Sequence, residues 1–188
     1  MKAQKISRLG YALLGLLRQR PSSGYDLRKI FSSTAMKTYS DSPGAVYPAL
    51  RRLEQQGLIR GSLEHGSGLR RRQIFHHTPK GLAELKKWIV RPITQDDLAR
   101  RDLEVLLRFA FSEEVVGPVA SVQLLKSLQA ELVVHLAVLS EQLAAARSKM
   151  SISGRLAFEC GLRGCESWLE WTRYAIATYE KQEKGGKS

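Results

Sequence analysis

The sequence predicts a mainly α-helical protein with one small β-hairpin, built from two domains that meet near residue 92. Apolar residues recur at helical spacing through most of the 188 residues, and a glycine-rich turn separates two short runs that are typical of strands. Residues 1–90 contain 17 Lys and Arg against 5 Asp and Glu, whereas residues 91–188 contain 13 of each. We therefore expect residues 1–92 to bind a polyanion and residues 93–188 to form an electrically balanced helical domain with a different role.

The composition is typical of a soluble globular protein. Hydrophobic residues make up 43% of the chain and charged residues 26%. The longest apolar runs, such as residues 12–17, are too short to cross a bilayer, and the N-terminus lacks the pattern of a secretory signal. We expect a cytoplasmic protein with no membrane partner, whose net charge of +12 is typical of nucleic-acid binding.

Two helices are expected at the start of the basic domain. Residues 7–20 place leucines and alanine at helical spacing, and the Pro-Ser-Ser-Gly sequence at residues 21–24 ends that pattern. Residues 25–31 carry apolar side chains on one side and two basic side chains on the other. A short second helix therefore follows the turn.

A third helix is expected to begin at Ser42 and Pro43. Serine caps free helix amides, and proline is tolerated at the first helical position. Gly57 suits the left-handed position that terminates a helix. Pro48 falls inside this segment, where an interior proline costs roughly 3 kcal/mol. We therefore expect residues 43–47 to be bent or tightened relative to the residues that follow.

The two faces of this third helix differ in character. Val46, Leu50 and Leu53 share one side and are expected to face the core. Tyr47 and Arg51 are then left to point outward. The outward face is the part of the basic domain best placed to contact a partner.

A β-hairpin and a fourth helix complete the basic domain. Residues 58–63 and 72–77 are expected to be strands, joined by the turn at residues 64–68. Thr78 and Pro79 then begin a helix that ends near residue 90. Three helices followed by a hairpin are typical of a winged helix-turn-helix.

The second domain is expected to contain helices and no strand. We expect helices over residues 102–111, 117–147 and 155–181, of which the last two are long and rich in leucine. Two long helices with so much apolar surface are most simply completed by a second copy of the chain. The predicted dimerisation residues are Leu125, Leu128, Leu132, Leu139, Leu162 and Leu169.

The winged helix-turn-helix pattern predicts where duplex DNA would bind. The third helix of this fold enters the major groove, and the hairpin follows the backbone or the minor groove, whose negative potential attracts arginine. The candidate DNA-binding residues are Ser42, Gly44, Tyr47, Arg51, Arg52, Arg70, Arg71 and Arg72. Each has an ordinary alternative, a plain cap for the serine and a solvated side chain for the arginines. Whether Arg51 contacts a guanine edge or a phosphate stays open.

Three motifs in the basic domain resemble those of the PadR family of transcription regulators. They are Gly-Tyr-Asp-Leu at residues 24–27, the segment SPGAVYPALRRLEQQGLI at residues 42–59, and Thr-Pro-Lys-Gly at residues 78–81. The resemblance covers roughly residues 9–90, and it includes the proline inside the third helix. Ser23 stands where the family commonly has histidine, and Phe75, His76 and His77 replace its usual ending of the second wing strand.

The resemblance implies a fold, a partner and a mode of control. It implies a homodimer that binds a palindromic operator in double-stranded DNA, usually as a repressor. It also implies release from DNA by a small aromatic or hydrophobic ligand. Trp168 and Trp171, three residues apart on the last helix, could stack on such an effector, although such a stripe is more often dimer core.

Catalysis and bound cofactors are not expected. The four histidines show no ligand spacing with cysteine or aspartate, and no phosphate-binding glycine loop or nucleophile motif is visible. Cys160 and Cys165 match neither a zinc nor a redox spacing, and we expect both to be buried packing residues. The alternative function is a winged-helix module that binds an acidic protein partner. An RNA-binding role comes third, because no exposed aromatic platform is apparent.

Overall fold

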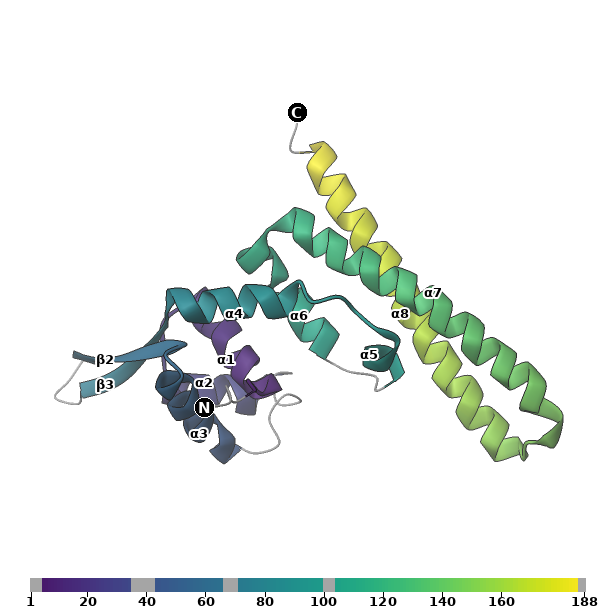
Figure 1. The fold of residues 1–188 in the computed structure, drawn as a ribbon, viewed down its shortest axis with the longest axis horizontal. Helices are drawn as coiled ribbons and strands as arrows, with labels where there is room; N and C mark the ends of the chain where they lie inside the picture. The colour runs from purple at the N-terminus through teal and green to yellow at the C-terminus, as the bar shows by residue number, and fades with distance from the viewer. Residues whose placement is uncertain (1–4, 35–42, 66–70, 100–103, 186–188) are drawn as a thin grey trace. The chain divides into compact units, whose positions relative to one another are not determined.

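The computed structural model describes residues 5–34, 43–65, 71–99 and 104–185. The chain divides into two compact units, Met1–Ile89 and Val90–Ser188. The first unit combines helices with a small sheet, and the second unit, as described, consists of helices (Figure 1). This agrees with the predicted fold class.

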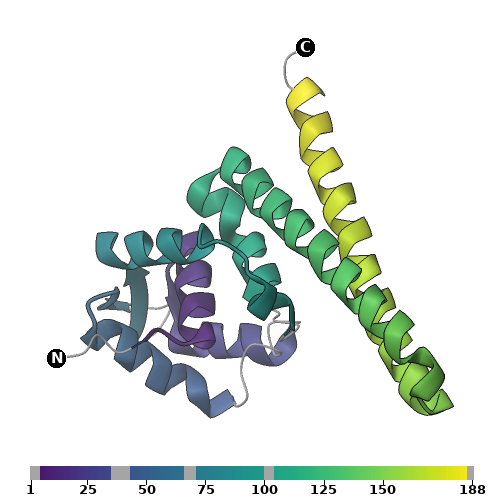
Figure 2. The same ribbon diagram turned by 45° about the vertical axis from the view of Figure 1, so that its right-hand side comes forward.

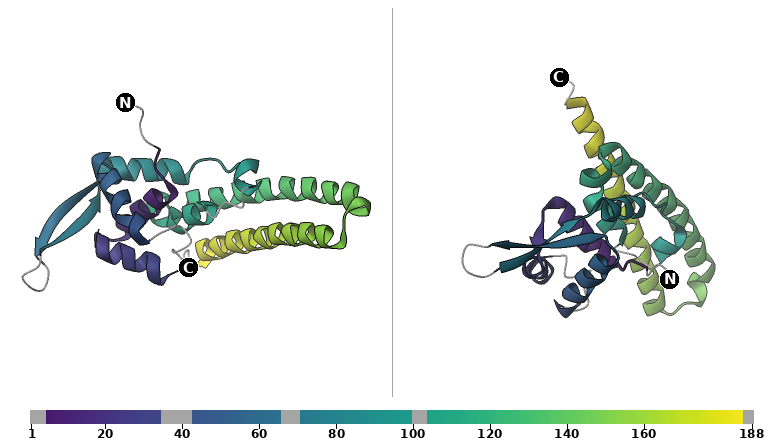
Figure 3. Two further views of the ribbon diagram at one scale, coloured as in Figure 1. Left: turned by 90° about the horizontal axis from the view of Figure 1, so that it is seen from below. Right: turned by 60° about the vertical axis from the view of Figure 1, so that its left-hand side comes forward.

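The described part of the first unit contains four α-helices and a three-stranded antiparallel sheet. In chain order its elements are α1 (Arg8–Gln19), β1 (Ser22–Ser23), α2 (Gly24–Ser33), the 3-10 turn η2 (Pro43–Ala45), α3 (Val46–Gln55), β2 (Ile59–His65), β3 (Arg71–His77) and α4 (Pro79–Ile89). The strands lie in the order β1-β3-β2, so β3 is central. The long β2–β3 hairpin projects from the helices, as Figure 3 shows.

The core of the first unit is made by the apolar faces that the sequence predicts. All three helices of the helix-turn-helix contribute, and α4 covers them with Leu85, Trp88 and Ile89. Tyr11 of α1 stacks on Trp88 with ring centroids 4.3 Å apart. The fully buried side chains of this core include Leu13, Leu14, Leu17, Leu27, Leu50, Ile59, Leu85 and Ile89.

The structure differs from the sequence prediction at Ser22 and Ser23. These residues were expected in a turn, yet they form β1 and pair with Phe75 and Ile74 of β3. Both serines are buried, and Ser23 also caps α2. A two-residue strand has no periodicity, so nothing in the local sequence could indicate it.

The start of the third helix is tightened, as the sequence predicts. Residues 43–45 form a 3-10 turn, and the α-helix begins at Val46. Pro48 therefore lies in the first turn of α3, where backbone N–H groups have no partner within the helix. The proline that seemed to interrupt the helix costs no hydrogen bond at this position.

The second unit is organised around a helical hairpin. Its elements are α5 (Gln95–Ala99), α6 (Glu104–Val116), α7 (Pro118–Ala146), the 3-10 turn η3 (Arg147–Lys149) and α8 (Ile152–Gly185). Helices α7 and α8 lie side by side and antiparallel in every view (Figures 1 and 2). Gly117 has a φ of 85° and precedes the proline that opens α7.

Two boundaries in this unit differ from the prediction. Helix α5 was not predicted, because five residues are too few for a periodic pattern. The break expected at residues 150–154 is shorter, since Ser151 caps α8 by accepting the Gly154 N–H at 3.2 Å. The last helix therefore begins at Ile152, three residues earlier than predicted.

Most of the leucines predicted to form a dimer seam lie inside the unit itself. Four of them are buried between α7, α8 and their neighbours: Leu125, Leu128, Leu132 and Leu169. Trp168 and Trp171 are half-buried and pack against the same clusters. The Trp171 ring meets Phe109 edge-on at 5.5 Å. The four leucines therefore pack within the unit, where they hold α7 to α8. Their burial does not support the prediction that they contact a second copy of the chain.

The long helix α7 also bears on the membrane prediction. Together with η3 it spans Pro118–Lys149. Its most apolar window has a mean hydropathy of 1.4, and 22% of that window is buried inside the protein. By length and composition alone this helix could cross a membrane. The prediction from uninterrupted apolar runs did not include this helix. One such helix is weak evidence, because a core helix of a soluble protein passes the same test.

Candidate nucleic-acid interface

Helix α3 presents the predicted candidate residues on its outer face. Val46 and Leu50 are buried beneath it, whereas Tyr47 keeps 43% of its surface exposed and Arg51 is exposed beside it. Arg52 is also exposed, and its Nε donates a hydrogen bond to the Pro48 carbonyl at 3.2 Å. Burial of Tyr47 or Arg51 would have excluded a groove-binding helix.

The N-terminal end of the interface is only partly described. Gly44 lies exposed within η2. Ser42 lies outside the described residues. The residue preceding α3 is Ala45, whose methyl group cannot accept a hydrogen bond from the helix amides. No side chain therefore caps the start of α3, which continues directly from η2.

Gly24 explains how Tyr47 reaches its position. A Cβ at Gly24 would lie 2.7 Å from Cε1 of Tyr47 and 3.2 Å from Cδ1, closer than real side chains approach. The tyrosine ring therefore lies directly over the start of α2. Ser23 fixes that start by accepting the Asp26 N–H at 3.2 Å. The Gly-Tyr motif thus supplies the space that the α3 tyrosine occupies.

Tyr25 is a candidate that the sequence analysis missed. It follows Gly24 directly, and 60% of its surface is exposed, which is unusual for a large aromatic side chain. It belongs to α2, the helix that precedes the recognition helix and crosses the DNA backbone in this fold. The sequence signal for Tyr25 is the Gly-Tyr-Asp-Leu motif at residues 24–27. The sequence prediction took this motif only as evidence of a family resemblance and gave Tyr25 no role.

The Thr-Pro-Lys-Gly motif fastens the C-terminal end of α3. The Thr78 hydroxyl lies 2.8 Å from the carbonyl oxygen of Gly57 and 3.1 Å from that of Leu58, within donating distance of both. Lys80 Nζ donates to the carbonyl of Gln56 at 2.7 Å, where the helix dipole favours a cation. A Cβ at Gly81 would collide with the Leu58 carbonyl oxygen. Only glycine allows α4 to pack this closely.

A carboxylate on α3 also joins the helix to the wing, the hairpin formed by β2 and β3. Glu54 Oε1 accepts the backbone N–H of Gly61 in β2 at 2.8 Å. Gly61 has no side chain, and a Cβ there would lie 2.9 Å from the same oxygen. This hydrogen bond connects α3 to strand β2 of the wing.

Of the three arginines predicted on the wing, Arg72 is the one whose side chain the structure describes. Arg72 is exposed in β3 and pairs in register with Glu64 of β2. Arg71 begins β3, and nothing is described of its side chain. Arg70 lies outside the described residues. The glycine turn at residues 66–68 lies outside them as well.

The first unit exposes many cations and few anions. Among its described residues, the exposed basic side chains are Lys5, Arg8, Arg18, Arg20, Arg28, Lys29, Arg51, Arg52, Arg60, Arg72, Lys80, Lys86 and Lys87. Its described acidic residues are Asp26, Glu54, Glu64 and Glu84. The Asp26 carboxylate accepts a hydrogen bond from the Ser23 hydroxyl, and Glu54 accepts one from the Gly61 N–H. The unit therefore presents an excess of positive charge to a polyanion.

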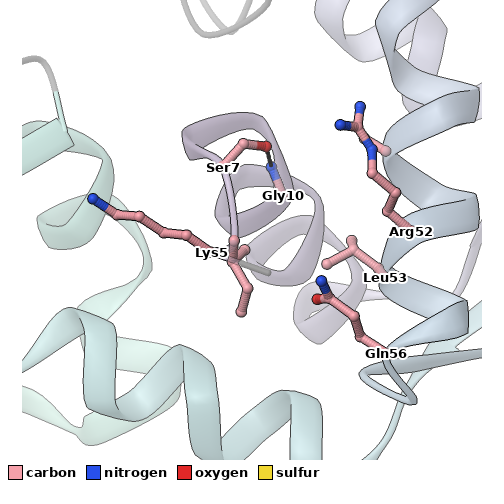
Figure 4. Close-up of a pocket in the computed structure, with 8 residues that line it drawn as sticks. Lys5, Ser7, Gly10, Arg52, Leu53 and Gln56 are labelled. Atoms are coloured by element: carbon pink, nitrogen blue, oxygen red, sulfur yellow. Dashed lines mark hydrogen bonds between the residues drawn. The ribbon is translucent and has the colours of Figure 1, made fainter. Parts of the chain in front are cut away.

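A small hollow between α1 and α3 does not serve as a ligand site. Its volume is about 40 Å³, enough for a water molecule. Arg52 and Gln56 border it from α3, and Ser7 caps α1 through the Gly10 N–H at 3.1 Å (Figure 4). Lys5 points away from Arg52 in this view, so the two cations do not form a joint anion site.

Metal binding and thiol packing can also be judged on the described residues. They contain no group of three or more His, Cys, Asp or Glu side chains that could hold a metal ion. The prediction that both cysteines are buried was wrong. Cys160 is exposed and Cys165 is half-buried, because α8 keeps one face uncovered by the chain's own helices.

Three helices, a short strand and a projecting hairpin define the first unit as a winged helix-turn-helix domain. Residues 13–87 match the family described as "Transcriptional regulator PadR-like family". The first unit is thus similar in sequence to this family of transcriptional regulators over residues 13–87.

Two curated transcriptional regulators are similar to part of this chain. The negative transcriptional regulator PadR of Bacillus subtilis is 31% identical over 83 residues, which cover 44% of this chain and 46% of that protein. A probable transcriptional regulator of Mycobacterium tuberculosis is 26% identical over 128 residues, 63% of this chain and 68% of that protein. In the first match the chain thus spans about half the length of its relative.

Solved structures of similar proteins cover nearly the whole chain. Bacillus subtilis PadR in complex with operator DNA has a TM-score of 0.42 and 22% identity, covering 91% of this chain and 98% of that one. The PadR-like regulator BC1756 from Bacillus cereus has a TM-score of 0.43 and 21% identity, covering 95% and 99%. Bacillus subtilis PadR has also been solved with p-coumaric acid.

Proposed function

We propose that this protein is a dimeric, sequence-specific DNA-binding regulator that represses transcription from a palindromic operator in the cytoplasm. The observation that carries the proposal is the outer face of α3, where Tyr47 and Arg51 are exposed on a strongly basic winged helix-turn-helix unit. The repressor role is supported by the similarity to the Bacillus subtilis relative, which is a negative transcriptional regulator.

The proposed mechanism divides the contacts between base edges and phosphates. The N-terminal half of α3 lies in the major groove, where Tyr47 and Arg51 meet bases or flanking phosphates. Ser42 and Gly44, at the N-terminal end of this segment, contact a phosphate, because a helix N-terminus carries partial positive charge. Arg52, on the same helix, contacts the phosphate backbone of the DNA. The wing brings Arg70, Arg71 and Arg72 against the backbone or into the minor groove.

A second copy of the chain would cover apolar surface that the second unit leaves exposed. On α7 the exposed aliphatic residues include Val133, Val134 and Val138, and on α8 they include Ile152 and Leu156. Leu139 and Leu162 are half-buried near them and remain predicted dimer residues. Pairing two such surfaces would place two basic units on one twofold-symmetric site.

Control by a small effector stays part of the proposal. Stacking of an effector on Trp168 and Trp171 receives little support, because both indoles pack against the unit's own core. The second candidate function, binding of an acidic protein by the same basic face, is favoured only by the exposed aliphatic wing residue Leu63.

The salt dependence of binding separates DNA from an acidic protein partner. Operator sequences would first be selected from genomic DNA with the full chain. The affinity should then fall with salt along a log–log slope of about −0.9 per phosphate neutralised. Arg70, Arg71 and Arg72 changed together to alanine should lower that slope for every sequence alike.

Arg51 tests the recognition helix separately. Arg51→Ala should weaken operator binding by about 1–3 kcal/mol and relax preference at one position if the guanidinium meets a base. Arg163→Ala, which removes an exposed cation from α8, is the matched control and should leave affinity and slope unchanged. Unchanged operator binding by both the triple variant and Arg51→Ala would sink the proposal.

A further inference from the structure

The wing has two faces, and the register of its strands tells which residues share each face. Successive side chains of a strand point to opposite faces of the sheet. Phe75 is buried in the core and lies opposite Gly61. The next pair on the same face, farther along the projecting hairpin, is Leu63 and Gln73. This face therefore belongs to the core near the helices and leaves it at Leu63 and Gln73.

The face that carries Leu63 and Gln73 is turned toward α3. A Cβ at Gly61 would collide with Gln73 Nε2 and would lie 2.9 Å from Glu54 Oε1. The Gln73 side chain thus extends over Gly61, on the side where the carboxylate of α3 lies. A duplex bound to the recognition helix would therefore approach this face of the wing.

Both members of the pair are exposed. Leu63 keeps 67% of its surface exposed, more than any other large apolar residue in the described part of the first unit. Burial of such a side chain against a partner is favourable. The described charged side chains of the wing lie on its other face: Arg60, Glu64, Arg72 and the titratable His76. The face turned toward α3 thus offers an aliphatic side chain beside an uncharged amide.

An aliphatic side chain beside an amide suits the minor groove at A·T base pairs. The groove floor there presents only acceptors, adenine N3 and thymine O2, whereas a G·C pair adds the 2-amino group of guanine. The Gln73 amide can donate to those acceptors. A 2-amino group beneath Leu63 would lose its water without gaining a partner, which costs binding energy. Leucine and glutamine are both used by proteins that bind the minor groove.

We propose that Leu63 and Gln73 contact the minor groove beside the major-groove site of α3 and select A·T base pairs there. The inference rests on the proposed function, because it needs a duplex bound to α3. It assigns part of the sequence preference to two uncharged side chains. Their contribution releases no counterions, so it should not alter the salt dependence of binding, in contrast to that of the wing arginines.

The experiment uses the full-length protein and the operator selected from genomic DNA. Footprinting of the native chain locates the base pairs under the wing. Adenines there are replaced by 2,6-diaminopurine, which adds the 2-amino group to the minor groove and leaves the major-groove edge unchanged. The affinity of the native chain should fall roughly tenfold, the effect of one unfavourable base pair. Diaminopurine placed outside the wing footprint is the control and should change little.

Variants of the pair locate the discrimination. Leu63→Ala should weaken binding to the unmodified operator and bind the two operators within about threefold of each other, at an unchanged salt slope. Leu63→Met keeps an aliphatic side chain of similar reach and should retain the discrimination. Gln73→Ala should weaken it, whereas Gln19→Ala removes an exposed glutamine from α1 and should not. Thermal unfolding should be unchanged in Leu63→Ala, because the side chain is exposed.

The outcomes separate this inference from the proposed function. Operator binding that diaminopurine does not weaken, selected operators rich in G·C under the wing, or full discrimination in Leu63→Ala would each overturn the inference alone. Absence of operator binding by the native chain would overturn both. If Leu63→Ala binds the operator normally but binds poly-L-glutamate more weakly than the native chain, Leu63 serves an acidic protein partner instead.

Discussion

The two units of this chain expose different kinds of side chain, and the difference indicates different partners. The large apolar residues exposed on the described part of the first unit are Tyr25, Tyr47 and Leu63, which lie on α2, α3 and the wing. Those exposed on the second unit are mainly aliphatic and lie mostly along α7 and α8. Aromatic residues with a polar tip among cations suit a wet, charged partner, whereas rows of valine suit another protein surface.

The charge balance of the two units supports the same comparison. The basic excess is confined to the first 90 residues, and the remainder is balanced. A dimer formed through the second unit therefore avoids bringing two positive surfaces together at its interface. Four measurements test this difference between the two units.

Gly81 gives the largest expected effect, because it tests how tightly the first unit is packed. Gly81→Ala puts a methyl group into the carbonyl oxygen of Leu58 and should destabilise the first unit by about 3 kcal/mol. Chemical denaturation monitored by the Tyr11–Trp88 pair measures the change. Gly164→Ala is the control in α8, where a Cβ meets nothing, and should stabilise by roughly 0.5–1 kcal/mol. Equal effects at the two glycines would refute the packing argument.

Val134 tests whether the exposed face of the second unit is a dimer surface. Val134→Glu should weaken self-association by about 2 kcal/mol, since a charge would have to be buried without a partner. Sedimentation equilibrium of the full-length protein measures the constant. Gln142→Glu adds the same charge at another exposed position of α7 and serves as the control. A dimer unaffected by Val134→Glu would move the interface elsewhere.

Glu54 tests the connection between recognition helix and wing. Glu54→Ala removes the acceptor for the Gly61 N–H and should cost about 1 kcal/mol of operator affinity, with weaker protection of the DNA under the wing in footprinting. Glu54→Gln keeps an acceptor oxygen at the same place and should restore both. If glutamine fails to rescue, the carboxylate acts by its charge instead of by this hydrogen bond.

Tyr179 gives the smallest effect and concerns the second unit alone. Burial raises the pKa of its hydroxyl to about 12, and the hydrogen bond to Glu113 at 2.7 Å adds to the rise. A pKa raised above the unfolded value of 10 means stability that is complete below pH 10 and lost between pH 10 and 12. Tyr179→Phe should lose less stability than the native chain across that interval in thermal unfolding. Parallel pH profiles would show that the tyrosine does not titrate with folding.

Much of the first unit could be predicted because its signals are local. Helical spacing located α1 and α3, and glycine with proline marked their ends. The tightened start of α3 followed from Pro43 and Pro48. Strand β1 could not be predicted, because its two residues become a strand only by pairing with β3, fifty residues later.

In the second unit, sequence patterns predicted the helices but not the contacts between side chains. Leucine periodicity predicted α7 and α8, but it could not tell which partner each leucine meets. Leu125 and Leu128 proved to face the chain's own helices, while the valines between them and the turn stayed outside. The contact between His135 and Gln95 was equally hidden, because Gln95 lies forty positions away on a helix too short to predict.

The two ends of α3 are anchored unequally, and this has a consequence for how operators are read. Three attachments hold the C-terminal end, through Glu54, Thr78 and Lys80, while the opposite end emerges from a 3-10 turn behind an alanine. The N-terminal end of α3 is held by packing, since Val46 is fully buried and the Tyr47 ring lies against Gly24. If α3 contacts an operator as proposed, substitutions around Tyr47 would change those contacts and leave the three C-terminal attachments in place.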